Sequence, residues 1–137
     1  MNRYLIDTHI FIWSIKDPNL LSKSVLKELI DDNNILYISS ISLMEIAIKN
    51  RDGKLSLGKN VDYPTFVGNI QRFGIFLLNL ELRHLEVLNQ LSYPKTHRDP
   101  FDHLIVSQAI SDRICLVSAD NKMQYYTKQG LELFEMK

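Results

Sequence analysis

The chain has 137 residues, with 16 acidic and 16 basic side chains, 45% hydrophobic residues and a single cysteine. One compact domain is the default at this length, because folding removes roughly two thirds of the unfolded chain's surface from water. Cys115 lies in an apolar run and is expected to be a buried, inert thiol in a reducing compartment. The net charge of zero disfavours nucleic-acid binding through bulk positive charge.

No segment has the pattern of a membrane span or an export signal. The most apolar N-terminal stretch, residues 4–15, is interrupted by Asp7, Thr8 and His9 and is too short to cross a bilayer. The sequence also shows no internal repeat and no low-complexity linker. We therefore expect a single domain over residues 1–137, in the cytoplasm and without a membrane partner.

Short apolar runs alternate with longer segments of helical period. This pattern predicts an α/β fold with a mostly parallel central sheet flanked by helices. The predicted elements, in chain order, are strand 3–6, helix 20–30, strand 35–39, helices 42–49 and 62–73, strand 75–78, helices 81–90 and 100–111, strand 114–118 and a marginal edge strand 131–134. Asp99 and Pro100 are a strong helix start, as N-cap and first helical residue.

Four carboxylates fall at the ends of predicted strands or the starts of predicted helices. Asp7 directly follows the first strand, and Asp120 follows strand 114–118 by two residues. Glu45 and Asp102 are each expected in the first turn of a helix. The carboxyl ends of parallel strands meet at one edge of the sheet, where ligands bind. Because like charges this close require protons or cations, we predict a shared site.

Oxygen-only ligands suit Mg²⁺ or Mn²⁺ better than zinc. A water bound to such an ion has a lowered pKa and can attack a phosphodiester, while the cation stabilises the charge that develops on the phosphate. The four carboxylates therefore indicate nuclease chemistry.

Each acid also has a purely structural interpretation. Ser42 and Glu45 match a capping box, in which the glutamate bonds back to the N-cap amide. Asp102 alone would complement a helix dipole, and Asp120 alone would be an ordinary turn residue. Asp7 is harder to explain structurally, because a carboxylate next to apolar runs needs a partner. The shared edge favours a site over these separate explanations.

Two histidines near Asp102 allow a zinc site in principle. We favour the oxygen-only set, because His97 is expected in a loop and His103 points about a third of a turn away from its neighbour Asp102. Basic residues are concentrated just after Glu45, at Lys49, Arg51, Lys54 and Lys59. The first three are predicted to bind substrate phosphates, although a solvated helix end with an ordinary Glu45–Lys49 pair is the alternative.

Five segments, taken in order, resemble the motifs of a PIN domain, specifically the VapC-like toxins of bacterial type II toxin–antitoxin pairs. They are residues 4–9 (YLIDTH), 39–49 (SSISLMEIAIK), 53–55 (GKL), 98–102 (RDPFD) and 116–120 (LVSAD). The resemblance implies a parallel sheet flanked by helices and a Mg²⁺- or Mn²⁺-dependent endoribonuclease acting on RNA. It also implies a homodimer that is inhibited by a small antitoxin protein reaching into the acidic site.

Carried over by position, the resemblance assigns roles to individual residues. The metal-binding and catalytic acids are Asp7, Glu45, Asp102 and Asp120, the accessory residues are Asp99, Thr8 and Ser118, and the substrate-binding residues are Lys49, Arg51 and Lys54. The chain departs from the related pattern at Met44, where Trp is frequent, at His103, where Arg is frequent, and at Ser118, where Thr is frequent. None of these departures removes a proposed metal ligand.

Two other functions compete with a nuclease. A catalytically silent PIN-like module would bind RNA or a protein partner, but four retained acids would repel RNA phosphates. A Mg²⁺-dependent phosphotransfer receiver would show paired acids early in the chain, and Asp7 has no acidic neighbour. We therefore expect a toxin nuclease.

Overall fold

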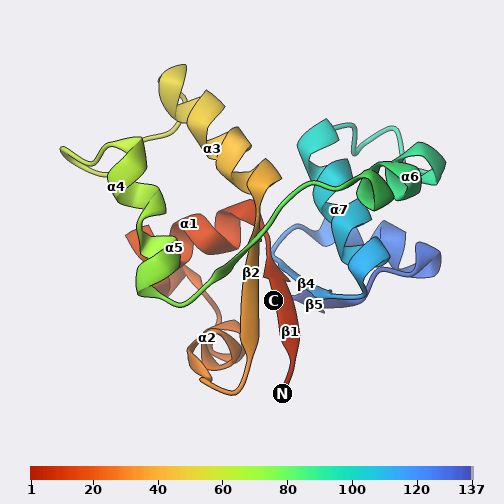
Figure 1. Ribbon diagram of the computed structural model, residues 1–137, viewed down its shortest axis with the longest axis horizontal. Coiled ribbons are helices and arrows are strands. Elements are labelled where there is room, and N and C mark those ends of the chain that lie inside the picture. Colours follow the sequence, from red (N-terminus) through yellow and green to blue (C-terminus); the bar gives the residue numbers. More distant parts are fainter. Residues whose placement is uncertain (137) are drawn as a thin grey trace.

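The structure is a computed structural model that describes residues 1–136. Its centre is a five-stranded sheet in the order β3-β2-β1-β4-β5, and every neighbouring pair of strands is parallel. The strands are β1 (Arg3–Ile6), β2 (Ile35–Ser39), β3 (Phe76–Leu78), β4 (Cys115–Ser118) and β5 (Leu133–Glu135) (Figure 1). The predicted α/β class with a parallel sheet is confirmed.

Helices cover both faces of this sheet (Figure 1). They are α1 (Thr8–Lys16), α2 (Lys23–Ile30), α3 (Ser40–Arg51), α4 (Tyr63–Val67), α5 (Asn69–Arg72), α6 (Leu82–Gln90) and α7 (Pro100–Asp112), with 3-10 turns η1 (Pro18–Leu20) and η2 (Asn121–Gln129). Within the described residues, none of these helices is long and apolar enough to span a membrane.

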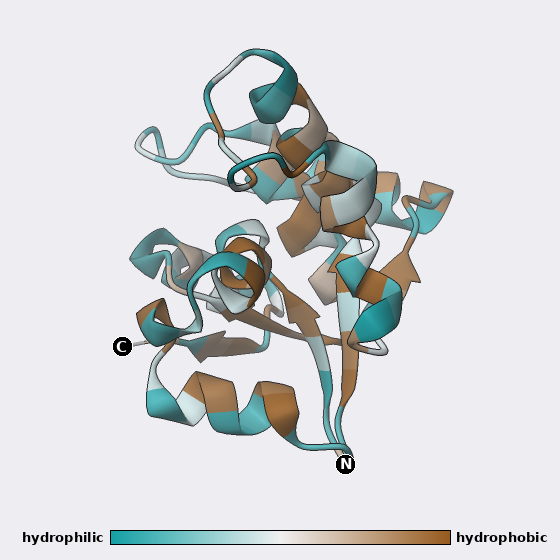
Figure 2. Ribbon diagram, turned by 90° about the vertical axis from the view of Figure 1, so that its left-hand side faces the viewer, coloured by the Kyte–Doolittle hydropathy of each residue, from teal (hydrophilic) through white to brown (hydrophobic). Residues whose placement is uncertain are grey.

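The sheet separates two apolar cores, because successive side chains of a strand point to opposite faces. In β1, Tyr4 and Ile6 pack with α1 and α2, whereas Leu5 packs on the opposite face with α7 and η2. Hydrophobic residues accordingly dominate the strands, and they alternate with hydrophilic residues along the outer helices (Figure 2).

Helix α1 and the 3-10 turns η1 and η2 were not predicted from the sequence, and one predicted helix is divided in two. Helix α1 carries three consecutive buried apolar residues, from Ile10 to Ile12, and so lacks the helical period of a half-exposed helix. Turn η2 is a 3-10 element, in which apolar residues do not follow the α-helical period. The helix predicted over 62–73 is divided at Gly68 into α4 and α5.

The strand order places a switch point between β1 and β4. From β1 the chain moves outward through β2 to β3, and then returns to the other side of β1 with β4 and β5. In open α/β sheets, ligands bind beyond the carboxyl ends of the strands at such a point. Asp7 follows β1 and Asp120 follows β4, so two of the predicted acids flank it.

Arg113 lies between α7 and β4 in the left-handed region, with φ 55° and ψ 46°, where glycine is preferred. We expect Arg113→Gly to increase the free energy of unfolding by about 1 kcal/mol, because the strain of a Cβ is relieved. Urea denaturation measures the change. Arg113→Ala is the matched control, since it keeps the strain; an equal gain in that variant would show that the long side chain, and not the backbone, is responsible.

Candidate metal centre

Asp7 links the end of β1 to the start of α1. Its Oδ1 accepts a hydrogen bond from the Thr8 backbone N–H at 2.8 Å, and its Oδ2 accepts one from the Ser118 hydroxyl at 2.7 Å. The residue is only 6% exposed, and burial raises the pKa of this carboxyl although both hydrogen bonds oppose the rise. Ser118 therefore ties Asp7 to the carboxyl end of β4, across the switch point.

Glu45 lies in the second turn of α3 and is buried, with 3% of its surface exposed. Its Oε2 is 2.7 Å from the Lys49 ammonium nitrogen. Its Oε1 is buried and, among the described residues, has no hydrogen-bond partner. A buried carboxylate oxygen with no donor is costly, so this atom is available to a cation.

The alternative role of Ser42 and Glu45 as a capping box does not hold, because α3 begins two residues before the predicted helix 42–49. Ser39 is the N-cap and accepts a hydrogen bond from the Ile41 N–H. The Ser42 hydroxyl instead accepts a hydrogen bond from the Thr8 hydroxyl at 2.9 Å. Thr8 thereby connects the starts of α1 and α3, and Glu45 faces the site without serving as a cap.

Asp102 lies in the first turn of α7, as predicted. Burial, together with the charges of neighbouring carboxylates, raises the pKa of its carboxyl to about 8. These neighbours are, in decreasing order of effect, Asp7, Asp99, Glu45 and Asp120. Four elements far apart in the sequence have therefore brought the predicted acids close enough to repel one another.

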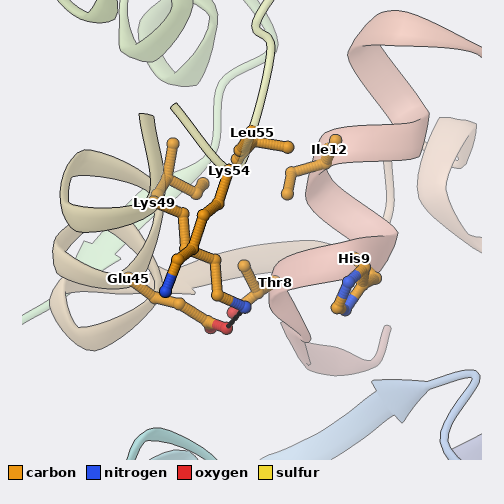
Figure 3. A pocket seen from close by; sticks show the side chains of 8 residues that line it. Thr8, His9, Ile12, Glu45, Lys49, Lys54 and Leu55 are labelled. Carbon is orange, nitrogen blue, oxygen red and sulfur yellow. Dashed lines mark hydrogen bonds and ion pairs between the residues drawn. The ribbon is translucent and has the colours of Figure 1, made fainter. Parts of the chain in front are cut away.

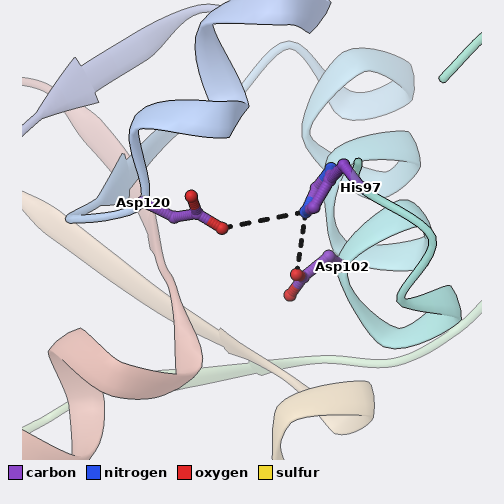
Figure 4. A group of neighbouring side chains, drawn as sticks. All are labelled: His97, Asp102 and Asp120. Atoms are coloured by element: carbon purple, nitrogen blue, oxygen red, sulfur yellow. Dashed lines mark hydrogen bonds and ion pairs between the residues drawn. The ribbon is translucent and has the colours of Figure 1, made fainter. Parts of the chain in front are cut away.

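Asp120 begins η2 and is more exposed than the other acids. Its Oδ1 accepts a hydrogen bond from the Lys122 N–H at 2.9 Å, and its own N–H donates to the Ser118 hydroxyl at 3.1 Å. Its Oδ2 points toward His97 Nε2, the same ring nitrogen that contacts Asp102 Oδ2 (Figure 4). Ser118 thus contacts both Asp7 and Asp120.

His97, which the sequence analysis considered only as a disfavoured zinc ligand, contacts two of the acids. It lies in the loop before α7, 4% exposed, with Nε2 2.9 Å from Asp102 Oδ2 and 3.7 Å from Asp120 Oδ2 (Figure 4). One potential ligand atom each of His97, Asp102 and Asp120 lie within 4.8 Å of one another. The sequence signal for this contact is that His97 lies two residues before Asp99, the N-cap of α7. From that position a side chain can fold over the first turn of α7.

Basic residues border one side of the acids. A small pocket of about 130 Å³ is lined by Thr8, His9, Ile12, Glu45, Ile46, Lys49, Lys54 and Leu55 (Figure 3). The hydrogen bond to Glu45 raises the pKa of Lys49, and the charges of Asp99 and Asp102 act in the same direction. Both lysines thus line the pocket beside Glu45.

Arg51 and Asp99 differ from this arrangement. Arg51 lies on the exposed end of α3 and pairs with Asp52 at 2.8 Å, so the structure does not bring it to the pocket. Asp99 caps α7 by accepting a hydrogen bond from the Phe101 N–H at 2.9 Å. Its charge also acts on Asp102, which leaves it at the margin of the site.

The donor set fits a hard divalent cation. Carboxylate oxygens from several elements converge at the switch point, and only Lys49 provides a paired cation among the contacts described above. The unpartnered Glu45 Oε1 and the raised pKa of Asp102 both show that the site has too little positive charge to stabilise its ionised carboxylates. Mg²⁺ or Mn²⁺ would supply that compensation, and oxygen ligands are the ones these ions prefer.

Comparison with known proteins agrees with this architecture. The fold matches that of VapBC2 from Rickettsia felis bound to a promoter DNA fragment, with a TM-score of 0.70 and 19% identity over 98% of this chain and 99% of that chain. The DNA-bound VapBC of Salmonella typhimurium gives a TM-score of 0.70 and 18% identity, with 98% of each chain covered. VapBC-5 of Mycobacterium tuberculosis, from a family of toxin–antitoxin systems, gives 0.63 and 14%, covering 98% of this chain and 99% of that chain.

These identities are low, so the structural matches establish the shared fold. No protein with curated annotation shows significant sequence similarity to the chain. The family model of the PIN domain, however, matches residues 4–129, which include all four predicted acids. The chain belongs to the PIN domain family.

Proposed function

We propose that the protein is a metal-dependent endoribonuclease that acts as the toxin of a type II toxin–antitoxin pair. The observation that carries the proposal is the convergence of buried, undercompensated carboxylates at the switch point of a PIN fold. Asp7, Glu45, Asp102 and Asp120 would hold one or two Mg²⁺ or Mn²⁺ ions. Such an ion lowers the pKa of a water and stabilises the charge that develops on a phosphodiester.

The protein's own side chains prepare this site in two ways. Hydrogen bonds from Thr8 and Ser118 fix the Asp7 carboxylate while leaving its charge in place. Lys49 and Lys54, on the pocket beside Glu45, would contact the phosphates of the RNA and offset their repulsion by the acids. Arg51 would contact RNA only by leaving its pair with Asp52.

The proposed partners follow from the neighbours of the same fold. Those neighbours are VapBC complexes, two of them bound to DNA. We extend this association to the present chain, with a small antitoxin as its inhibitor and a homodimer as its assembly. Such an antitoxin would inhibit by placing a basic side chain among the carboxylates, since the acidic centre attracts any cation that reaches it.

We expect Asp7→Asn to lower RNA cleavage roughly 100-fold or more, because a cation at a phosphodiester contributes several kcal/mol. Cleavage of a mixed RNA substrate is measured with and without Mn²⁺ for both proteins. Asp62→Asn is the matched control, since Asp62 is also an N-cap but is exposed, at the start of α4. Equal activity in all conditions would contradict the proposal, and metal-independent RNA binding without cleavage would favour a silent binding module.

Lys49→Met is expected to lower the free energy of unfolding of the metal-free protein by about 1–2 kcal/mol, because it leaves the buried Glu45 carboxylate without its cation. Lys54→Met removes a neighbouring charge that makes no such pair and should leave stability within about 0.5 kcal/mol. Both variants should bind RNA more weakly. Urea denaturation and RNA titration separate the two effects; equal stability of both variants would show that the Glu45–Lys49 pair is not stabilising.

The raised pKa of Asp102, about 8, predicts how stability depends on pH. The Asp102 carboxyl binds a proton more tightly in the folded protein than in the unfolded chain. Its contribution to the free energy of unfolding is therefore fully present below about pH 4 and is lost as pH rises toward 8. Asp102→Asn should therefore make the metal-free protein more stable than wild type at pH 8, by up to a few kcal/mol. Denaturation midpoints at pH 5 and pH 8 measure the difference; a deficit of the variant at pH 8 would contradict it.

A further inference from the structure

His97 and Tyr126 form a buried hydrogen bond beside the acids. Tyr126 is fully buried, and its hydroxyl oxygen lies 2.6 Å from His97 Nδ1. Burial raises the pKa of the phenol to about 12, so the hydroxyl keeps its proton at neutral pH. The Tyr126 hydroxyl is therefore a buried donor that requires a hydrogen-bond acceptor.

The only acceptor within hydrogen-bond distance of that hydroxyl, among the described residues, is His97 Nδ1. A buried donor without an acceptor is costly, so Nδ1 must carry a lone pair and accept. The proton of a neutral imidazole then lies on Nε2. The Nε2–H donates to Asp102 Oδ2 at 2.9 Å and faces Asp120 Oδ2 at 3.7 Å.

The position of the His97 ring is fixed from its backbone as well. His103 donates from its Nε2 to the His97 carbonyl at 2.6 Å, and the Tyr93 ring packs on His103 with 4.4 Å between ring centroids. His103 is buried, and its Nε2 is engaged by this backbone carbonyl. It therefore supports the loop, while His97 contacts the acids.

We infer that His97 is a positioning residue and not a metal ligand: Tyr126 holds it as the Nε2–H tautomer, and its Nε2–H holds Oδ2 of Asp102, which would leave Oδ1 to bind a cation. A nitrogen that carries a proton cannot bind a metal, so the site keeps an oxygen-only ligand set. The tautomer follows from the hydrogen bonds alone, whereas the role toward the cation rests on the proposed function.

The protein contains its own reference for this assignment. His84 is also fully buried, its Nδ1 accepts from the Glu81 backbone N–H at 2.9 Å, and its Nε2 lies 3.1 Å from Asp112. A backbone amide is always a donor, so His84 must be the Nε2–H tautomer. His84 packs in α6, apart from the acidic centre, and is the matched control.

Long-range ¹H–¹⁵N NMR of the metal-free, full-length protein at pH 7 tests the tautomer. We expect His97 to show a protonated Nε2 and an unprotonated Nδ1, as His84 does. Tyr126→Phe should move the His97 Nδ1 signal, which loses its donor, and leave the His84 signals in place. A His97 with the proton on Nδ1, or on both nitrogens, would overturn the inference.

Titration with diamagnetic Mg²⁺ then separates a positioning residue from a ligand. Retention of the His97 Nε2–H at saturating Mg²⁺ supports the inference, and its loss, with a proton appearing on Nδ1, overturns it. If the tautomer is as expected but wild type binds neither Mg²⁺ nor Mn²⁺, the proposed function fails and the tautomer assignment stands.

The affinity for Mn²⁺, measured by calorimetry, tests the consequence for the cation. Removing a hydrogen-bond partner of a metal ligand usually weakens metal binding 10- to 100-fold, so we expect a loss of about that size for His97→Gln. His84→Gln removes an equally buried histidine and should leave the affinity unchanged. An unchanged Mn²⁺ affinity in His97→Gln, with the variant folded by its His84 signals, would overturn the positioning role.

Discussion

The burial of several carboxylates around one point is the constraint on which the rest of this structure depends. Burial raises the pKa of Asp7, and burial together with its neighbours raises that of Asp102 to about 8. A fold gains nothing in stability from such an arrangement, since like charges in a site of low polarity repel strongly. The neighbouring hydrogen bonds and ion pair are best understood as what keeps these acids in place until a cation compensates them.

Sequence reasoning located the acids that follow strands, because a strand end fixes the place of the next residue. Asp7 and Asp120 are where the pattern of β1 and β4 put them. It misjudged Glu45 by one helical turn, because Ser42 looked like a cap and the actual cap, Ser39, lies inside the predicted strand. The contact of His97 with the acids could not be predicted from the sequence, because the place of this loop side chain depends on its packing with Tyr126, 29 residues further along the chain.

The zero net charge is a sum over two unlike regions. Acids crowd the carboxyl ends of β1 and β4, and lysines border the pocket beside Glu45. Bound cations would shift the local charge of the first region toward positive, which is the sign a phosphate requires. Neutral composition therefore excludes capture of nucleic acid by bulk charge and leaves recognition by a small site open.

The hydrogen bonds at the centre also differ in kind from one acid to the next. Asp7 is held by a hydroxyl and a backbone amide and Asp120 by a backbone amide, which orient a carboxylate without neutralising it. A neutral His97 does the same for Asp102. Glu45 alone is held by a full positive charge, that of Lys49. Glu45 is therefore the one acid of the four at which an entering cation meets a positive charge of the protein, and its Oε1 is the oxygen that Lys49 leaves unpartnered.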